Sequence, residues 1–92
     1  MDIEFIKKEK TEIEFAVKND DVAFYNIIEK IASNNSEVEF VALKKADNLI
    51  DEFTFYIRTK SKAAKTVLLE CISEAEKEFT KLIEELDKNT NL

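Results

Sequence analysis

Alternating hydrophobic and polar residues predict a β-hairpin at the start of the chain. From Glu12 to Lys18 large apolar residues occupy every second position, so one face of this strand is buried and the other faces water. An earlier strand begins at Ile3, and charged residues follow its apolar positions. We expect these two strands to pair through a turn near Glu9 to Thr11.

Two further strands are expected in the second half of the chain. Residues 37–45 and 53–59 are rich in β-branched and aromatic residues, which favour strands. Polar residues at 46–48 and 60–62 predict a loop after each. Within 37–45, strict alternation assigns the apolar side chains to two opposite faces: Val38, Phe40 and Ala42 on one, Val41 and Leu43 on the other.

Helical spacing of apolar residues predicts a first helix between the two pairs of strands. Asn19, Asp20 and Asp21 form a helix-start signal, because their side chains accept hydrogen bonds from free backbone N–H groups. We interpret the two aspartates as caps rather than a cation site. Asn34 and Asn35 end the helix, with Asn as the residue that tolerates a left-handed conformation in a chain without glycine. The apolar positions are Phe24, Ile27, Ile28 and Ile31.

A single long helix is predicted from 63 to 88. At 1.5 Å per residue it extends about 39 Å, which is longer than a small sheet, so its end should overhang. Its apolar arc covers roughly 160°, whereas a helix lying on one sheet needs about 100°. The surplus either packs on a partner chain or is covered by the first helix. We favour a partner, because the first helix has only about three turns, and we expect residues 89–92 to fray.

The predicted order of elements is β-β-α-β-β-α, which indicates an α+β fold. We expect a four-stranded, mostly antiparallel sheet with two helices on one face. The 92 residues contain no linker, repeat or low-complexity segment, so residues 1–92 are interpreted as a single domain. Hydrophobic residues make up 45% of the chain, which is enough to form one core.

Composition argues against most kinds of chemistry. The chain has no His, one Cys and no Gly, so a histidine base, a Cys–His metal cluster and a glycine-rich phosphate loop are excluded. Cys71 lies on the apolar face of the long helix and is expected to be a buried thiol. The carboxylates near Glu74 and Glu84 alternate with lysines, as on a solvated helix face. We therefore expect no catalytic residue, cofactor, metal or small-molecule substrate.

Charge and segment patterns bear on partners and location. A net charge of −6 disfavours direct binding to nucleic acid or to anionic membranes. No apolar run reaches 18 residues, and the start of the chain lacks the basic segment of a signal peptide. A lone cysteine fits a reducing compartment. We expect a soluble, cytoplasmic protein.

Tyr56 and Arg58 share one face of a strand and are either a recognition patch or isolated polar residues.

Four segments together follow the pattern of a known family: Met1-Asp2-Ile3-Glu4, Asp20-Asp21 with Asn26-Ile27-Ile28, Val38-Glu39-Phe40-Val41-Ala42, and Phe55-Tyr56-Ile57-Arg58-Thr59. In this order, and with the long helix after them, they resemble the L-subunit family of archaeal DNA-directed RNA polymerase. That family is related to the eleventh subunit of eukaryotic RNA polymerase II and to the dimerisation domain of the bacterial α subunit. Val22 and Ala23 stand where the family usually has His-Thr, and residues 46–48 replace its Pro-His-Pro turn.

The resemblance implies a role in assembly. The L subunit pairs with the D (alpha-like) subunit, and that heterodimer is the platform for the large catalytic subunits. The chain would then have no catalytic residues of its own within a nucleotidyltransferase complex. The alternative is a paralogous stand-alone module that self-associates or pairs with another partner. The residues expected at the interface are Phe24, Ile27, Ile28, Ile31, Leu68, Ile72, Phe79 and Ile83.

Overall fold

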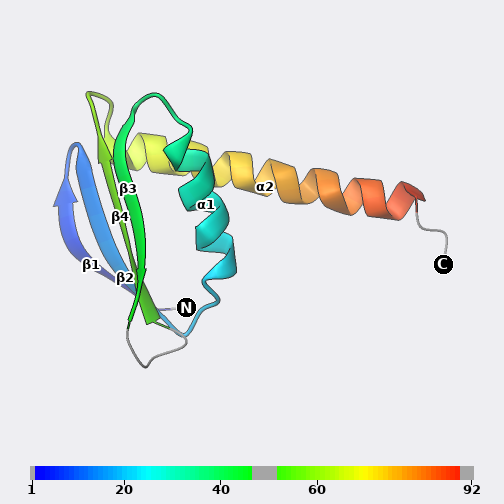
Figure 1. Cartoon of the computed structure of the whole chain (residues 1–92), viewed down its shortest axis with the longest axis horizontal. Coiled ribbons are helices and arrows are strands. Elements are labelled where there is room, and N and C mark those ends of the chain that lie inside the picture. The colour runs from blue at the N-terminus through cyan, green and yellow to red at the C-terminus, as the bar shows by residue number, and fades with distance from the viewer. Residues whose placement is uncertain (1, 47–51, 90–92) are drawn as a thin grey trace.

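Six elements follow one another in the predicted β-β-α-β-β-α order. The computed structural model describes residues 2–46 and 52–89, so residues 47–48 of the predicted loop and residues 90–92 of the segment expected to fray lie outside the described part. Asn89, the first residue expected to fray, is the last residue of a helix. Figure 1 shows the arrangement of the elements. They are β1 (Asp2–Glu9), β2 (Glu12–Lys18), α1 (Ala23–Ser33), β3 (Val38–Lys45), β4 (Glu52–Thr59) and α2 (Ala64–Asn89).

The four strands form one sheet in the order β1-β2-β4-β3, and each neighbouring pair is antiparallel. The central strands β2 and β4 have every second side chain buried, as their alternating pattern predicts. Both helices contribute buried residues to the same cluster as these strands, so both lie on one face of the sheet. The predicted α+β fold class is confirmed.

The first hairpin turns where the charged residues predict. Glu9 pairs with Glu12, which leaves Lys10 and Thr11 as the turn. β1 nevertheless extends through its polar residues, and a bulge lies between Phe5 and Lys7. The charged end of the strand is therefore part of the sheet, where each residue pairs with the backbone of β2.

The prediction for the faces of β3 is wrong at Val38. A bulge between Val38 and Phe40 places an extra residue in β3 and reverses the alternation at that point. Val38 consequently packs against the core together with Val41 and Leu43. Phe40 is exposed and contacts Tyr56, with ring centroids 5.9 Å apart.

The first helix begins two residues after the predicted aspartate cap. Asp21 Oδ1 accepts a hydrogen bond of 2.8 Å from the N–H of Ala23, the first residue of α1. Among the described residues, the left-handed conformation occurs at Asn19, with φ 58°, rather than at the helix end. Asn34 remains in the right-handed region, with φ −95°, so the expected left-handed cap there is wrong. Its side-chain amide instead donates to the carbonyl of Lys30.

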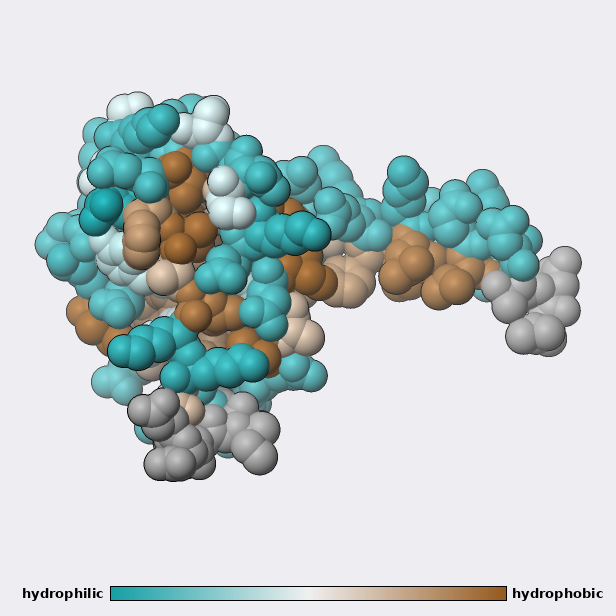
Figure 2. All heavy atoms as spheres, in the orientation of Figure 1, coloured by the Kyte–Doolittle hydropathy of each residue, from teal (hydrophilic) through white to brown (hydrophobic). Residues whose placement is uncertain are grey.

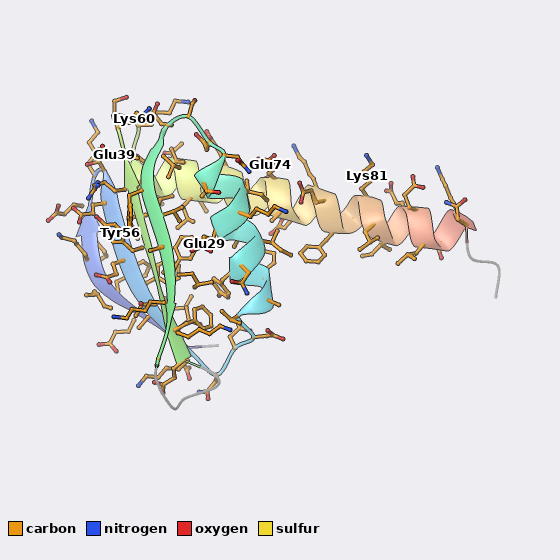
Figure 3. All side chains as sticks on the ribbon, viewed as in Figure 1. Glu29, Glu39, Tyr56, Lys60, Glu74 and Lys81 are labelled. Atoms are coloured by element: carbon orange, nitrogen blue, oxygen red, sulfur yellow. The ribbon has the colours of Figure 1, made fainter. Side chains whose placement is uncertain are left out.

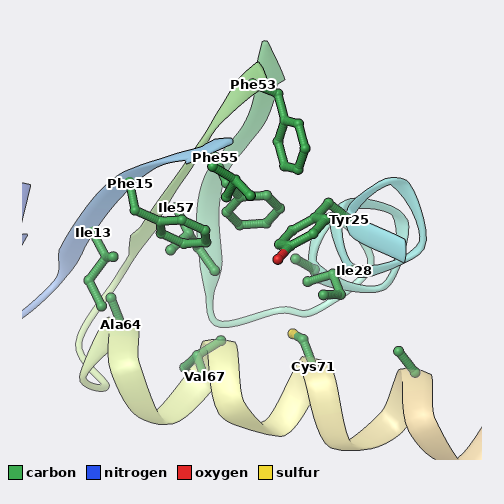
Figure 4. Close-up of a cluster of buried hydrophobic side chains, with 13 residues drawn as sticks. Ile13, Phe15, Tyr25, Ile28, Phe53, Phe55, Ile57, Ala64, Val67 and Cys71 are labelled. Carbon is green, nitrogen blue, oxygen red and sulfur yellow. The ribbon is translucent and has the colours of Figure 1, made fainter. Parts of the chain in front are cut away.

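The core lies between the sheet and the two helices. Figure 4 shows aromatic rings from β2 and β4 stacked above α2, with Tyr25 and Ile28 entering from α1. Phe15 and Phe55 have ring centroids 5.6 Å apart, and neither side chain is more than slightly exposed. Cys71 is buried at the base of this cluster, as predicted, and burial raises the pKa of its thiol.

Hydrogen bonds at the N-terminus of α2 set the direction of this helix. The N–H of Ala64 donates to the carbonyl of Lys10 in the hairpin turn at 2.7 Å. Glu37 Oε1 accepts hydrogen bonds from the N–H and hydroxyl of Ser61 and from the N–H of Lys62, all within 2.9 Å. These bonds hold the pKa of the Glu37 carboxyl at about 2. From this start α2 runs past α1 and projects beyond it (Figure 1), as its length predicts.

Candidate protein interface

The two halves of α2 have different surroundings. The first half contacts β2, β4 and α1, and each successive turn places a residue in the core. Every described residue after Ala75 is exposed. The amphipathic pattern nevertheless continues through the second half, and the four buried residues of the first half are Ala64, Val67, Cys71 and Ala75.

The projecting half carries an exposed line of large hydrophobic side chains. We call this the tail stripe; it consists of Phe79, Leu82, Ile83 and Leu86, at helical spacings of three and four. Ile83 is 66% exposed. In Figure 2 the lower side of the projecting helix is brown and its upper side is teal. Lys81 extends from that polar side in Figure 3. A continuous apolar line of this kind is typical of an interaction surface.

Contact between α1 and α2 ends at Phe79. Its ring stacks on Phe24 of α1, with centroids 5.9 Å apart and planes at 30°, yet the side chain is still 40% exposed. The first helix therefore covers the apolar arc only as far as this residue. Beyond Phe79, no described residue of the chain packs over the tail stripe.

The structure separates the residues expected at the interface into three groups. Ile28 is 2% exposed and belongs to the chain's own core, so it is not available on the surface of this fold. Phe79 and Ile83 are exposed on the projecting half of α2. The other five are half-buried and pack against the core: Phe24, Ile27, Ile31, Leu68 and Ile72.

Two residues of the tail stripe, Leu82 and Leu86, were not among the residues expected at the interface. Leu82 and Leu86 lie three and seven positions after Phe79, and both are more exposed than it is. Their helical spacing was visible in the sequence. The sequence did not show that contact between α1 and α2 ends at Phe79, before these two leucines. That depends on where the two helices cross.

A second apolar surface lies on the sheet beside the start of α2. α1 packs on the β3 side of the sheet, so the part of this face formed by β1 is left uncovered. An open groove of about 530 Å³ results. We call it the β1 groove; its lining is Ile3, Phe5, Lys8, Glu9, Ile13, Phe15, Lys65, Leu68 and Leu69.

The opposite face of the sheet carries a polar network rather than a site of chemistry. Glu12 Oε1 accepts a hydrogen bond of 2.7 Å from the hydroxyl of Tyr56 and one of 3.0 Å from Lys7 Nζ. These bonds lower the pKa of Glu12. Arg58 Nε lies 3.4 Å from Glu39 Oε1, and its guanidinium sits over the ring of Phe40. Lys7 pairs with Glu12 and Arg58 with Glu39, while Arg58 Nε makes no hydrogen bond.

The acidic residues are spread over the described surface. Within residues 2–46 and 52–89, no three His, Cys, Asp or Glu side chains are close enough to hold a metal ion. In that same part of the chain no helix is long and apolar enough to cross a membrane. In the described part of the chain, most of the exposed large hydrophobic side chains lie in the tail stripe or the β1 groove.

The chain is thus a small α+β domain whose exposed apolar surfaces are typical of domains that bind other proteins. The family model described as the RNA polymerase Rpb3/Rpb11 dimerisation domain matches residues 12–85, and the chain belongs to this family. The chain is similar in fold to the crystal structure of DNA-directed RNA polymerase subunit L from Thermoplasma acidophilum. The TM-score is 0.71 at 17% identity, over 99% of this chain and 97% of the other. No curated protein sequence matches the chain. The resemblance to this family is confirmed.

Proposed function

We propose that this protein is a non-catalytic assembly subunit of a DNA-directed RNA polymerase, in the place of subunit L. Its partner is the D (alpha-like) subunit, and the heterodimer is the platform for the large catalytic subunits in the cytoplasm. The chain itself binds no cofactor, metal, nucleic acid, membrane or small molecule in this role. Membership of the Rpb3/Rpb11 dimerisation family supports the proposal.

The observation that carries the proposal is the tail stripe. Four large hydrophobic side chains stand in line on a helix that has left its own core. Burying one such side chain fully contributes about 1.5–3 kcal/mol, so four of them can offset much of the entropy lost on association. The stripe continues from the half-buried Leu68 and Ile72, so a partner would cover one face along the whole helix.

Phe79→Ala tests this role. Phe79 lies where the partner surface meets Phe24, and we expect its removal to weaken binding of the D subunit by about 2–4 kcal/mol, as for a buried interface aromatic. The fold should lose much less, because the ring is partly exposed in the free chain. The measurements are co-purification with the D subunit, calorimetric titration and thermal melting.

Lys81→Ala is the matched control, since Lys81 lies two residues away on the solvated side of the same helix. It should leave both quantities unchanged. If Phe79→Ala unfolds the chain while partner affinity persists in the folded fraction, Phe79 belongs to the internal core and the assignment fails. A wild-type chain that does not associate with the D subunit at all would refute the proposal itself.

A stand-alone module that self-associates is the second candidate. One observation favours it: the chain carries both a projecting apolar helix and an uncovered apolar groove. The two functions are separable, because the first requires a D subunit and the second requires only a second copy.

A further inference from the structure

We infer that the outer face of the sheet, the face turned away from both helices, docks a basic and partly apolar segment of a polymerase subunit other than D. We call this surface the outer patch; it consists of Ile6, Glu12, Glu14, Phe40, Tyr56 and Arg58. The inference rests on the proposed function and deepens it, because it gives the chain a second interface besides the one assigned to the D subunit. It makes Tyr56 and Arg58 part of a recognition patch rather than isolated polar residues.

A β-bulge at one edge of the sheet brings an apolar and a charged side chain together on the outer face. Phe5 of β1 points to the helix side, where it lines the β1 groove, so by alternation Ile6 points outward. The bulge between Phe5 and Lys7 turns Lys7 outward as well, and its Nζ lies 3.0 Å from Glu12 Oε1. Ile6, which is 57% exposed, therefore stands next to an ion pair.

A second bulge, in β3, does the same at the opposite edge. Glu39 Oε1 lies 3.4 Å from Arg58 Nε, and the ring of Phe40 contacts that of Tyr56, so both β3 residues lie on the outer face. Phe40 is 49% exposed. Among the described residues, Ile6 and Phe40 are the two exposed large hydrophobic side chains that belong to neither the tail stripe nor the β1 groove. Both stand on the outer face.

Hydrogen bonds and ring contacts connect the two edges across the centre of the sheet. The hydroxyl of Tyr56 donates to Glu12 Oε1 at 2.7 Å, and the ring of Tyr56 contacts Phe40. The guanidinium of Arg58 lies 5.6 Å from the centre of the Phe40 ring. In Figure 3, Glu39 and Tyr56 lie on the side of the sheet away from α1. Side chains that are already held in this way lose little rotamer freedom when a partner binds, which suits the patch for recognition.

The charges of the outer face favour a basic occupant. The two cations of this part of the face are already engaged in the ion pairs with Glu12 and Glu39. Two carboxylates remain: Glu14, which lies in register between β1 and Tyr56, and Glu4, two residues before Ile6. Within residues 2–46 and 52–89 neither of them has an ion-pair partner. A lysine or arginine of the docked segment pairs with these carboxylates, while its apolar neighbours cover the exposed rings and Ile6.

The size and position of the outer face suit a segment rather than a whole domain. Four strands span about 14 Å across, and eight residues of strand extend about 26 Å. One helix, with a diameter of 10–12 Å, or one hairpin fills that area. Figure 1 shows both helices on the other side of the sheet, with α2 projecting away from it. A D subunit bound to the tail stripe therefore leaves the outer patch accessible.

Photo-crosslinking in the assembled polymerase is the first test. A photo-reactive phenylalanine analogue replaces Phe40, which is exposed, and the enzyme is purified from cells through a tag on this chain. We expect a crosslink to a subunit other than D, within a segment that contains lysine or arginine. The inference is overturned by a crosslink to the D subunit alone, by one to an acidic segment, or by none in an intact assembly.

Substitutions provide the second test, with the purified pair of this chain and the D subunit added to the remaining subunits. Phe40→Ala removes an exposed ring from the patch, and Glu14→Lys places a cation against the basic segment. Each should weaken recruitment of the remaining subunits about tenfold and leave binding of the D subunit unchanged. Glu84→Lys is the control: it changes the net charge equally, but it lies beside Lys81 on the polar side of α2. Thermal melting verifies that all variants fold.

Binding of the D subunit, measured separately, distinguishes the two possible failures. If both patch variants bind the D subunit and recruit the remaining subunits as the wild type does, the inference is wrong and the proposed function stands. An equal loss with Glu84→Lys would show a general effect of charge and would also contradict the inference. If the wild-type chain does not bind the D subunit, it is the proposed function that fails.

Discussion

The two halves of α2 have the same kind of sequence but different neighbours. Residues 64–75 repeat apolar positions every three or four residues, and the sheet and α1 cover them. Residues 76–89 repeat the same pattern but are all exposed, and the ring of Phe24 stacks on Phe79 near their start. Amphipathic spacing therefore specifies only which face of a helix is apolar. Whether that face stabilises the fold or binds a partner depends on how far the rest of the domain reaches.

The largest effect is expected from a cavity on the covered side. Phe15→Ala removes a ring that is 7% exposed and stacks on Phe55, so it should lower the free energy of unfolding by about 3–5 kcal/mol. That is a large share of the roughly 5–10 kcal/mol that stabilises such a domain. Urea denaturation followed by circular dichroism measures it. A loss below about 1 kcal/mol would show that the core is not closed around this ring.

A matched pair of substitutions on α2 tests the comparison directly. Val67 is fully buried in the first half, and Val67→Ala should cost the fold about 1–3 kcal/mol through loss of packing. Ile83→Ala removes a larger side chain from the second half, yet it should change stability by less than about 0.5 kcal/mol, because Ile83 is exposed. Denaturation of the two variants under conditions where the chain is monomeric decides the point. If Ile83→Ala costs as much as Val67→Ala, the projecting half is part of the folded core.

A smaller effect is expected on the pH dependence of stability, from Glu37 and its hydrogen bonds to the turn before α2. The pKa of Glu37 is lowered to about 2 by hydrogen bonds from Lys62 and Ser61. A carboxyl with a depressed folded-state pKa contributes stability that is fully present above its unfolded value, near 4.5, and that is lost as the pH falls towards 2. Glu37→Gln keeps an acceptor oxygen but does not titrate. Between pH 4.5 and 2 the wild type should therefore lose more stability than this variant.

Thermal melting across that pH range provides the measurement, and the other carboxyl groups are common to both proteins. Equal slopes for wild type and Glu37→Gln would mean that the contacts with Ser61 and Lys62 do not depend on the charge of Glu37. The direction of α2 would then rest on the backbone hydrogen bond between Ala64 and Lys10.

The sequence by itself determined the order of the elements and the apolar face of each regular one. Alternation in β2 and β4 and helical spacing in α2 are local patterns, and the buried residues follow them. They are readable because the backbone geometry of strands and helices fixes which neighbours share a face. In α1 the buried residues are Tyr25, Ile28 and Ala32, so only Ile28 of the four predicted apolar positions is fully buried. The pattern also failed in β3, where the bulge after Val38 reversed the faces, and at the end of α1, where the left-handed residue is Asn19 rather than Asn34.

Only the tertiary structure decided which apolar residues remain uncovered. Ile28 and Ile27 are adjacent on α1, yet one is sealed in the core and the other is half-buried at its edge. Phe5 continues the alternation of its strand, but it is exposed because α1 packs over β3, at the other edge of the same face of the sheet. The strand order β1-β2-β4-β3 and the crossing of the two helices set these outcomes. Both depend on contacts between residues distant in sequence, so no local pattern of side chains contains them.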